Sequence, residues 1–560
     1  MNKMQENTFS VLNRENQLNH ISEKKFDLVI IGGGVTGAGI ALDAASRGMK
    51  TCLIEKNDFA SGTSNKSTKL IHGGLRYLKQ FEIGLVKESG RERAIVHKLA
   101  PHLVIPEKML LPLIEGGTYG KIMTAIGLKV YDILANVEGD DKRKMLDKDE
   151  TLEKEPLLDP ENVLAGGFYS EYRTDDARLT IELLKKAASF GATLLNYCEM
   201  DTFVYNEKGI LEHLDCKDHT TGKTLRITGR NFVSAAGPWV DTLRKKDKSI
   251  NEKYLHLTKG VHLVFPFDML PIAQSIYFDV PDGRMLFAIP RGRCTYVGTT
   301  DTTYTGDLDR VLTTQADVAY LLNAMNTTFP TVDLSEKDIE SSWAGLRPLI
   351  HEKGKNPSEL SRKDEIFVSD SGLISIAGGK LTGYRKMSQR VLEAVLKSLP
   401  KKRKKKLQLS ETENIALTSD PFQNKKEVAI YQEKLQQQLK NMGFADPYIA
   451  MYLVVTYGKQ TDLILRRFQQ YKDKDLIKSL VLAELWYTVH YEMVASITDF
   501  FVRRTARLFF DIKTVSTYKE IVLEELSNYL NWNEEKQKSE AKMLSQLIKD
   551  ATTFYVSEAG

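Results

Sequence analysis

The sequence predicts an α/β fold in three parts: a nucleotide-binding domain built on a parallel sheet, an antiparallel sheet inserted into it, and a helical C-terminal domain. Three observations support this. A glycine-rich turn directly follows the apolar run 28–31. Short alternating strands separated by turn residues occupy 255–300, and helical periodicity begins near residue 400. With 560 residues, the chain is too long for one core, so two or three domains are expected.

The glycine-rich turn has the pattern of a dinucleotide-binding site. Three glycines have the spacing that lets a strand turn tightly into a helix and brings backbone N–H groups to a pyrophosphate: Gly32, Gly34 and Gly37. The following helix is predicted over 40–48 and the second strand over 51–54, with Glu55 placed to bind ribose hydroxyls. A glycine-rich turn alone is common, but this complete order favours a Rossmann-like dinucleotide site.

The residues after Glu55 favour FAD over NAD as the dinucleotide. The segment 56–77 is rich in Gly, Ser and Thr and supplies many hydrogen-bond donors directly after the second strand. Thr63 and Ser64 would complete the pyrophosphate site. An ordinary polar loop is the alternative interpretation of this segment.

Two later apolar strands end in small residues, at the sheet edge where open α/β sheets bind ligands. Residues 231–235 lead to Ala236 and Gly237, and residues 373–377 lead to a Gly-Gly pair that opens a helix. The N-terminus of that helix would stabilise negative charge on a reduced flavin. The residues expected there to contact the cofactor are Gly379, Leu381 and Thr382.

These patterns divide the chain into discontinuous domains. The nucleotide-binding domain is predicted over 24–100, 168–250 and 340–399, and within it an acidic pair, Asp175 and Asp176, is predicted to cap a helix. The β-rich substrate-binding domain is predicted over 101–167 and 251–339, with a helix around 122–137, and the helical domain over 400–560.

Three segments leave alternatives open. Residues 2–25 are polar and predict a short helix or a loose arm. The basic run 401–406 is typical of a solvated linker, with contact to anionic lipid as the alternative. The aromatic residues within 482–510 indicate a helical core or a dimer face, and membrane contact stays open.

Composition excludes several classes of function. The 78 Lys and Arg residues nearly balance 74 Asp and Glu residues, so no nucleic-acid partner is expected. The four cysteines are scattered without a CxxC pair, which indicates reduced, buried thiols. We expect no catalytic metal, because acidic or His/Cys ligand clusters are missing, and no hydrolase, because a Gly-x-Ser-x-Gly elbow is missing.

The sequence also bears on the membrane. The first twenty-odd residues have no apolar core, so no signal peptide is expected, and no run of about eighteen apolar residues predicts a spanning helix. We therefore expect a soluble protein or one that lies on a membrane surface.

The predicted site is rich in cations. Arginine and lysine side chains in or beside the segments that return to the cofactor edge imply an anionic substrate, and a phosphate suits arginine especially well. These residues are Arg76, Arg347, Arg362 and Lys380.

Three motifs together carry a resemblance to a known family. The segments 31–48, 69–78 and 378–385 resemble signatures of FAD-dependent glycerol-3-phosphate dehydrogenases. The similarity covers about 26–399 motif by motif, and the helical tail is similar to the family's C-terminal cap domain. One departure is Ser388, which stands where the family usually has Ala.

The resemblance implies a D-amino-acid-oxidase-like fold and a bacterial respiratory enzyme. It implies oxidation of sn-glycerol 3-phosphate to dihydroxyacetone phosphate, with electrons passed to a membrane quinone. It also implies a cytoplasmic location, peripheral to the inner face of the cell membrane, with contact to an anionic membrane surface and a homodimer as a possible assembly.

The resemblance also assigns roles to residues. The positions that match substrate or phosphate ligands are Arg76, Tyr77, Arg362 and Lys380, and those beside the reacting carbon are His262 and Arg347. The mechanism we expect is hydride transfer from C2 to flavin N5, with His262 removing the hydroxyl proton and Arg347 stabilising the alkoxide. A hydrogen-bonded core histidine is the alternative interpretation of His262.

Three other functions stay open. An oxidase of the same family would use O₂ in place of quinone, although those members tend to be longer, with an insertion not seen here. An FAD-dependent amine or amino-acid oxidase would hold a carboxylate with one or two cations, fewer than this sequence supplies. A non-catalytic, membrane-associated flavoprotein or scaffold would have no need of His262, Arg347 and Lys380 together.

Overall fold

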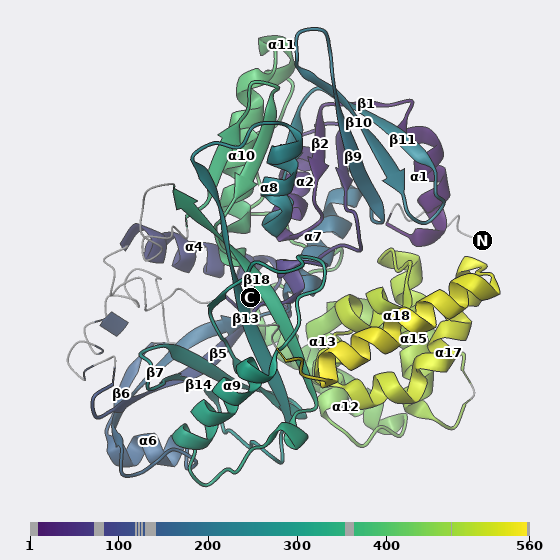
Figure 1. Cartoon of the computed structure of the whole chain (residues 1–560). Coiled ribbons are helices and arrows are strands. Elements are labelled where there is room, and N and C mark those ends of the chain that lie inside the picture. The colour runs from purple at the N-terminus through teal and green to yellow at the C-terminus, as the bar shows by residue number, and fades with distance from the viewer. Residues whose placement is uncertain are drawn as a thin grey trace.

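The computed structural model describes residues 9–71, 83–117, 120, 124, 127–128, 142–352, 363–471 and 473–556. Its elements form three regions (Figure 1): an upper α/β region, a lower β-rich region and, beside the latter, a helical region made by the C-terminal part of the chain. This architecture confirms the predicted fold class, an α/β protein with an antiparallel sheet and a helical C-terminal domain. The helix predicted around 122–137 lies largely outside the described residues.

The upper region is built on a six-stranded sheet with the order β19-β20-β12-β2-β3-β8, parallel except for the edge strand β19. Every residue of β2 and β3 is buried, as central strands of a covered parallel sheet require. The helices α2 (Val35–Ser46), α7 (Asp176–Ser189) and α10 (Tyr384–Ser398) pack into the same core. The strands are β2 (Leu28–Ile31), β3 (Thr51–Ile54), β8 (Thr193–Leu195), β12 (Phe232–Ser234), β19 (Glu365–Val368) and β20 (Leu373–Ala377).

The predicted strand, helix and strand around the glycine-rich turn are confirmed. Helix α2 begins at Val35, earlier than predicted, so the fingerprint glycine Gly37 lies inside its first turn. Asp175 caps α7 by accepting a hydrogen bond from the N–H of Arg178, which confirms the predicted acidic cap. Two further helices flank this region, α4 (Ile83–Leu99) and α8 (Val240–Lys246).

The lower region contains a large, mostly antiparallel sheet, as predicted for 255–300. Its longest pair joins β13 and β18, which run from the centre of the molecule to its base (Figure 1). This region also contains two helices, α6 (Lys148–Lys154) and α9 (Gln315–Thr328). Its strands are β4 (Leu70–Ile71), β5 (Ile105–Ile114), β6 (Lys144–Leu146), β7 (Val163–Arg173), β13 (Lys253–Pro266), β14 (Ser275–Asp279), β15 (Met285–Arg291), β16 (Cys294–Gly298), β17 (Thr302–Thr303) and β18 (Ser341–Glu352).

Two segments pair differently from the prediction. Residues 168–173 and 341–352 fall within the ranges predicted for the nucleotide-binding domain, but they lie in β7 and β18 of the large sheet. An apolar run predicts a strand without showing which strand it will pair with, because pairing depends on distant residues. The domain ranges themselves stay a proposal.

A small four-stranded sheet and the N-terminal segment complete the upper region. The segment predicted as a short helix or loose arm contains the turn η1 (Val11–Asn13) and helix α1 (Arg14–Ile21). Arg14 is buried and forms an ion pair with Asp218, so this helix is docked on the sheet. The strands of this sheet are β1 (Lys25–Phe26), β9 (Cys198–Tyr205), β10 (Leu211–Asp218) and β11 (Thr224–Gly229).

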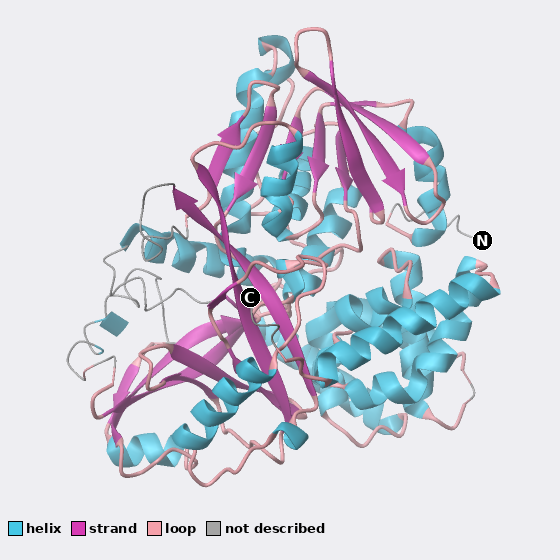
Figure 2. Cartoon of the chain, in the orientation of Figure 1, coloured by secondary structure: helices cyan, strands magenta, loops and turns pink. Residues whose placement is uncertain are grey.

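Within the described residues, the C-terminal region consists of helices joined by loops (Figure 2). The predicted helical stretch 482–510 is not continuous: α15 ends at Tyr491, the π-helix η9 (Asp499–Arg504) follows after a non-helical segment, and α16 begins at Arg507. Its phenylalanines are buried in the core, not presented on a surface. Within the described ranges, none of the helices combines the length and apolar character needed to cross a membrane. The helices are α12 (Lys425–Asn441), α13 (Tyr448–Tyr457), α14 (Thr461–Phe468), α15 (Leu476–Tyr491), α16 (Arg507–Phe510), α17 (Ile512–Leu530) and α18 (Glu534–Thr552).

The basic run 401–406 connects the upper region to the C-terminal region. Its first part forms a short helix, α11 (Lys401–Lys404), and most of its side chains are exposed, as expected of a solvated linker. Arg403 differs, because it forms an ion pair with Asp27 at the start of the parallel sheet.

Candidate active site

The glycine-rich turn joins β2 to α2 at the edge of the parallel sheet. Gly32 has a φ of +114°, and a Cβ on it would lie 2.5 Å from the carbonyl oxygen of Ala235. A Cβ on Gly37 would lie 1.9 Å from the carbonyl oxygen of Gly32. Both positions therefore require glycine, and Gly34 caps α2 without a side chain. The result is a helix N-terminus at the wall of an open cavity, which Gly34, Val35 and Thr36 help to line, and such a position favours phosphate binding.

Glu55 follows β3 and lies beside this turn. Its carboxylate accepts hydrogen bonds from the N–H of Gly33 at 2.7 Å and from the N–H of Asn57 at 3.0 Å. Burial raises the pKa of the Glu55 carboxyl, while these two N–H groups act in the opposite direction. Glu55 lines the same cavity as the glycine-rich turn, which is the position expected of a ribose ligand.

Thr63 and Ser64 lie in the short turn η2 (Thr63–Asn65) and both line the cavity. The Ser64 hydroxyl accepts a hydrogen bond from the N–H of Val35 at 2.9 Å, which holds η2 against the start of α2. The Thr63 hydroxyl instead donates to the carbonyl oxygen of Leu346 in β18, at 2.8 Å. The two hydroxyls thus fasten the pyrophosphate end of the cavity to the parallel sheet and to the large sheet.

A further part of the cavity wall comes from the ends of β12 and β20. Ala236, Gly237 and Gly379 line the cavity there, and Gly237 and Gly379 have positive φ values of +54° and +80°. Space is open where a Cβ on Gly237 would project. Leu381 also lines the cavity, whereas Thr382 is buried beside it in the turn η7 (Leu381–Gly383) that precedes α10.

The complete cavity is long and fits FAD. Its empty space is about 1410 Å³ with the open mouth included. A helix start suited to phosphate, a carboxylate after the next strand and a second glycine turn at the same sheet edge are features that suit a dinucleotide. Sequence reasoning missed the side chains around Glu55 that come from β9 and α8, namely Cys198, Met200 and Leu243, because their approach depends on the packing of a second sheet.

His262 lies on β13 and is almost completely buried, with 1% of its surface exposed. Its Nε2 lies 2.9 Å from the hydroxyl of Thr68, and its ring stacks on Trp343 with 4.7 Å between centroids. Among the described residues, its Nδ1 has no hydrogen-bond partner. Burial, together with the nearby cations Arg347 and Lys69, lowers the pKa of His262 well below its usual range. The imidazole is therefore neutral at physiological pH.

Thr68, which sequence reasoning did not single out, belongs to a tightly held loop. The hydroxyl of Tyr296 donates to the Thr68 carbonyl oxygen at 3.0 Å, and the indole N–H of Trp343 donates to the Ser67 carbonyl oxygen at 3.2 Å. Ser67 also lines the cavity, so this loop connects His262 to the cavity wall. A single threonine in a polar loop carries no sequence signal for such a contact.

Arg347 lies on β18, next to the cavity-lining residue Pro348. Its guanidinium donates to Thr299 Oγ1 at 2.9 Å and to Asp301 Oδ1 at 3.1 Å, and 30% of its side chain is exposed. The strand pairing thus brings Arg347 close to His262, and each is held by residues that the sequence did not indicate.

Lys380 is the predicted substrate ligand that the structure describes. It follows Gly379 and lines both the long cavity and an adjoining cavity of about 1010 Å³. Charged residues also line this second cavity: Glu88, Lys363, Asp364 and Arg390. The other predicted substrate ligands, Arg76, Tyr77 and Arg362, lie outside the described residues.

Comparison with known proteins agrees with this geometry. The profile of a family described as FAD dependent oxidoreductase matches residues 27–385, and a profile described as the C-terminal domain of alpha-glycerophosphate oxidase matches residues 412–537. The aerobic glycerol-3-phosphate dehydrogenase of Bacillus subtilis (strain 168) is 48% identical over 551 residues, which are 98% of this chain and 99% of that relative. The enzyme of the same name from Staphylococcus haemolyticus (strain JCSC1435) is 47% identical over 546 residues, covering 97% and 98% of the two chains.

Solved structures give the same result. The glycerol-3-phosphate dehydrogenase from Bacillus halodurans, in complex with FAD, is 42% identical with a TM-score of 0.82 and covers 98% of this chain and 100% of that chain. The L-alpha-glycerophosphate oxidase from Mycoplasma pneumoniae shares the fold, with a TM-score of 0.53, 20% identity and coverage of 67% and 95%. The cofactor is FAD, in agreement with the shape of the cavity. The chain belongs to the FAD-dependent oxidoreductase family, in its branch of aerobic glycerol-3-phosphate dehydrogenases.

Proposed function

We propose that this protein oxidises sn-glycerol 3-phosphate to dihydroxyacetone phosphate with FAD and passes the electrons to a membrane quinone. The observation that carries this proposal is the position of Lys380, at the wall shared by the FAD cavity and the charged adjoining cavity. A cation at that wall suits a small phosphorylated substrate that must reach the flavin from outside. The close relatives named above support the choice of glycerol 3-phosphate.

The residues that hold FAD follow from the cavity. The first turn of α2, with Gly32, Gly34 and Gly37, would bind the pyrophosphate, and Glu55 would bind the ribose of the adenosine half. When bound, FAD supplies at N5 an acceptor for the hydride that leaves C2 of the substrate. The other proposed ligands of the cofactor are Thr63, Ser64, Ala236, Gly237, Gly379, Leu381 and Thr382.

His262 is the proposed base for the C2 hydroxyl proton. A neutral imidazole can accept a proton, and burial keeps His262 neutral over the physiological range. Its Nε2 contacts the hydroxyl of Thr68, which can accept one hydrogen bond while donating another. Because Ser67 lines the cavity next to Thr68, we infer that Thr68 relays the proton between substrate and His262.

Arg347 and the remaining cations complete the proposed site. Asp301 and Thr299 orient the Arg347 guanidinium, which would stabilise negative charge on the C2 oxygen as the hydroxyl proton leaves. Lys380 would bind the substrate together with the ligands that the family resemblance implies, Arg76, Tyr77 and Arg362.

The central experiment follows the flavin absorbance of the purified holoenzyme without oxygen. We expect glycerol 3-phosphate to bleach the flavin and glycine or another amino acid to leave it oxidised, whereas bleaching by the amino acid alone would favour an amino-acid oxidase. A soluble quinone should then restore the absorbance faster than air does. Fast recovery in air with formation of peroxide would instead favour the oxidase, and no bleaching by any of these substrates would favour a non-catalytic flavoprotein.

A quinone acceptor requires contact with a membrane, so we also propose a peripheral location on the inner face of the cell membrane. The basic run 401–406 is the segment proposed to approach anionic lipid, since most of its side chains are exposed. Co-sedimentation with anionic vesicles at low salt, and loss of binding to neutral vesicles, are the expected results. Sedimentation of the free enzyme would test the proposed homodimer, and no nucleic-acid partner is proposed.

A further inference from the structure

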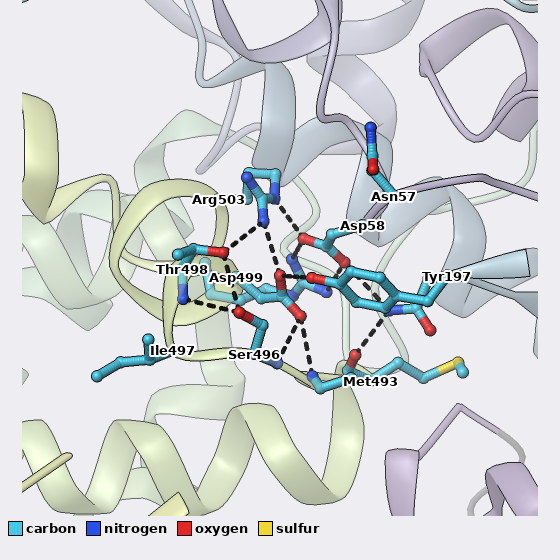
Figure 3. A network of polar contacts seen from close by, with 12 residues as sticks. Asn57, Asp58, Tyr197, Met493, Ser496, Ile497, Thr498, Asp499 and Arg503 are labelled. Atoms are coloured by element: carbon cyan, nitrogen blue, oxygen red, sulfur yellow. Dashed lines mark hydrogen bonds and ion pairs between the residues drawn. The ribbon is translucent and has the colours of Figure 1, made fainter. Parts of the chain in front are cut away.

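The loop that follows Glu55 is held by the C-terminal region (Figure 3). Asp58 is completely buried, and its Oδ2 accepts hydrogen bonds from Nε of Arg503 and, at 2.8 Å, from Nη1 of Arg504. Its Oδ1 accepts a second bond from Arg504, at 3.0 Å, and one from the amide of Asn196, at 3.2 Å. Two arginines of the C-terminal region, Arg503 and Arg504, therefore bind the carboxylate of Asp58 in the N-terminal part of the chain.

The two arginines are themselves fixed by the π-helix η9 and the turn before it. Asp499 Oδ1 accepts hydrogen bonds from Arg503 at 2.7 Å and from the Tyr197 hydroxyl at 2.5 Å, while its Oδ2 accepts the N–H groups of Ala495 and Ser496 (Figure 3). Arg504 also donates to the carbonyl oxygen of Glu492. π-helical turns are rare and often lie at functional sites, and this one presents consecutive arginines to a single loop.

The loop that contains Asp58 also carries Glu55. Asn57 lies between Glu55 and Asp58, and its N–H donates to the Glu55 carboxylate at 3.0 Å. The Asn57 carbonyl oxygen accepts the N–H of Tyr197 at 2.8 Å, and the Glu55 carbonyl oxygen accepts the N–H of Cys198 at 2.8 Å. A displacement of Asp58 would therefore be transmitted to Glu55 through Asn57, and Tyr197 contacts both Asn57 and Asp499.

The next residue, Phe59, makes the same loop a support for the glycine turn. Its ring stacks on Phe9 of the N-terminal segment, with 5.7 Å between centroids. The ring also lies directly against Gly33, where a Cβ would come within 2.7 Å of it. The loop thus contacts both groups proposed to hold the adenosine half of FAD, the glycine turn and Glu55.

Burying these four charged side chains requires a large desolvation free energy, so we infer that the cluster does more than attach the C-terminal region. Asp58 and Asp499 are fully buried and lie close to one another, and the two negative charges are balanced by Arg503 and Arg504. Such a cluster is expensive to desolvate and contributes little net stability compared with apolar packing. What it provides is a fixed geometry, because loss of one partner would leave a buried charge without compensation.

We propose that Arg503 and Arg504 are positioning residues for FAD, which hold Asp58 and thereby keep Glu55 aligned with the ribose of the adenosine half. The inference rests on the proposed role of Glu55. It gives the C-terminal helical region a part in cofactor retention, although none of its residues lines the cavity among those the structure describes.

The test compares Arg503→Met with the matched control Arg507→Met. Arg507 is also buried and donates to a buried carboxylate, Glu484 at 2.6 Å, but this pair lies entirely within the C-terminal region. We expect both variants to lower the midpoint of thermal unfolding. Only Arg503→Met should accelerate FAD release from the holoenzyme, by about tenfold or more, as judged by the fluorescence of the released flavin. Equal release rates in the two variants would overturn the proposal.

Two further variants separate a positioning role from general damage. Arg503→Lys keeps the charge and should bring FAD release back toward the wild-type rate; release as fast as in Arg503→Met would contradict the role of the ion pair. Glu55→Gln should accelerate release on its own, and adding Arg503→Met should then have much less effect than in the wild type. Fully additive effects would overturn the inference.

The Glu55→Gln variant also separates the proposed ribose contact of Glu55 from the proposed positioning role of Arg503 and Arg504. If it leaves FAD release unchanged, the ribose contact is wrong and the inference fails with it. If Glu55→Gln releases FAD faster while Arg503→Met does not, the cofactor site stands and only the positioning role fails.

Discussion

At the scale of single residues, the proposed proton transfer depends on a neutral, buried histidine. His262→Ala should slow flavin reduction by glycerol 3-phosphate by about 10²- to 10⁴-fold, the usual contribution of a general base. Because the pKa of His262 lies well below its ordinary value, the wild-type rate should not fall as pH is lowered through 6.5. Anaerobic stopped-flow measurements at several pH values would check both expectations.

The matched control for this variant is His256→Ala, on the same strand. His256 contacts Thr303 on an exposed part of the sheet, and its loss should leave flavin reduction unchanged. An unchanged rate in His262→Ala would show that His262 is a core histidine, the alternative that its stacking on Trp343 leaves open.

Thr68 gives a second prediction at this scale. Thr68→Val keeps the shape of the side chain but removes the hydroxyl that contacts His262 Nε2, so flavin reduction should slow by about tenfold or more. Thr68→Ser keeps the hydroxyl and should stay close to the wild type. Equal rates in the two variants, measured at saturating substrate, would exclude a role for the Thr68 hydroxyl in proton transfer.

At the scale of elements, the glycine turn between β2 and α2 makes a sharp prediction about cofactor binding. Gly37→Ala places a Cβ within 1.9 Å of the Gly32 carbonyl oxygen, so α2 must move away from β2. We expect a loss of about 3 kcal/mol in the free energy of unfolding and purification largely without FAD. The measurements are the flavin-to-protein absorbance ratio and denaturant unfolding.

The control for Gly37 is Gly84→Ala, in the exposed first turn of α4. Space is open around a Cβ at Gly84, so stability should change by less than about 1 kcal/mol and FAD content should stay normal. Full FAD content in Gly37→Ala would mean that α2 can shift without losing its phosphate-binding geometry.

The elements also show which parts of the fold the sequence could predict. The segment from β2 to Glu55 was predictable because its signals are local: a short apolar run, glycines at fixed spacing and an acidic residue after the next strand. The sequence could not predict that β18 belongs to the large sheet, because this depends on its pairing with β13, which is distant in sequence. The environment of His262 was hidden for the same reason, because Gly298 and Trp343 lie opposite it only in this strand register.

At the scale of the whole molecule, the C-terminal region is bound to the nucleotide-binding region by buried charges. Arg178 on α7 donates to Glu492, which follows α15, and Asp58 is held by Arg503 and Arg504. These partners are far apart in sequence and each is an ordinary charged residue, so no local pattern could reveal the interface. The helical character of this region was predictable, whereas its connection to the cofactor loop required the structure.

The same interface makes the molecule sensitive to acid. Its cations, chiefly Arg178 and Lys185, lower the pKa of Glu492 to about 2 against the opposing effect of burial. A carboxyl with a depressed pKa contributes stability above its unfolded value, and this stability is lost as pH falls from about 4.5 toward 2. Asp58 acts in the same direction, since Arg504 and Arg503 also lower its pKa.

His102 makes the free energy of unfolding depend on pH at less acidic values as well. It is buried against Phe422 and Gly458 at the interface, and burial with the nearby cations Arg178 and Lys185 lowers its pKa to about 3. The unfolded chain binds a proton near pH 6.5 that the folded protein does not bind until about pH 3. The free energy of unfolding should therefore decrease as pH falls below about 6.5.

His102→Leu tests this contribution directly. Neither ring nitrogen of His102 has a hydrogen-bond partner among the described residues, so the variant loses no polar contact that the structure describes. It should unfold at the same urea concentration as the wild type, or a higher one, at pH 7.5. Between pH 6.5 and pH 4.5 its stability should fall less steeply than that of the wild type, because the variant lacks one imidazole that is protonated only in the unfolded chain. Other groups set the slope that remains in both proteins: the pKa of His262 is also lowered, and the pKa of Asp499, raised to about 6 by burial, acts in the opposite direction. Parallel curves for the two proteins would show that His102 is protonated in the folded state or that its neutral form is not required at the interface.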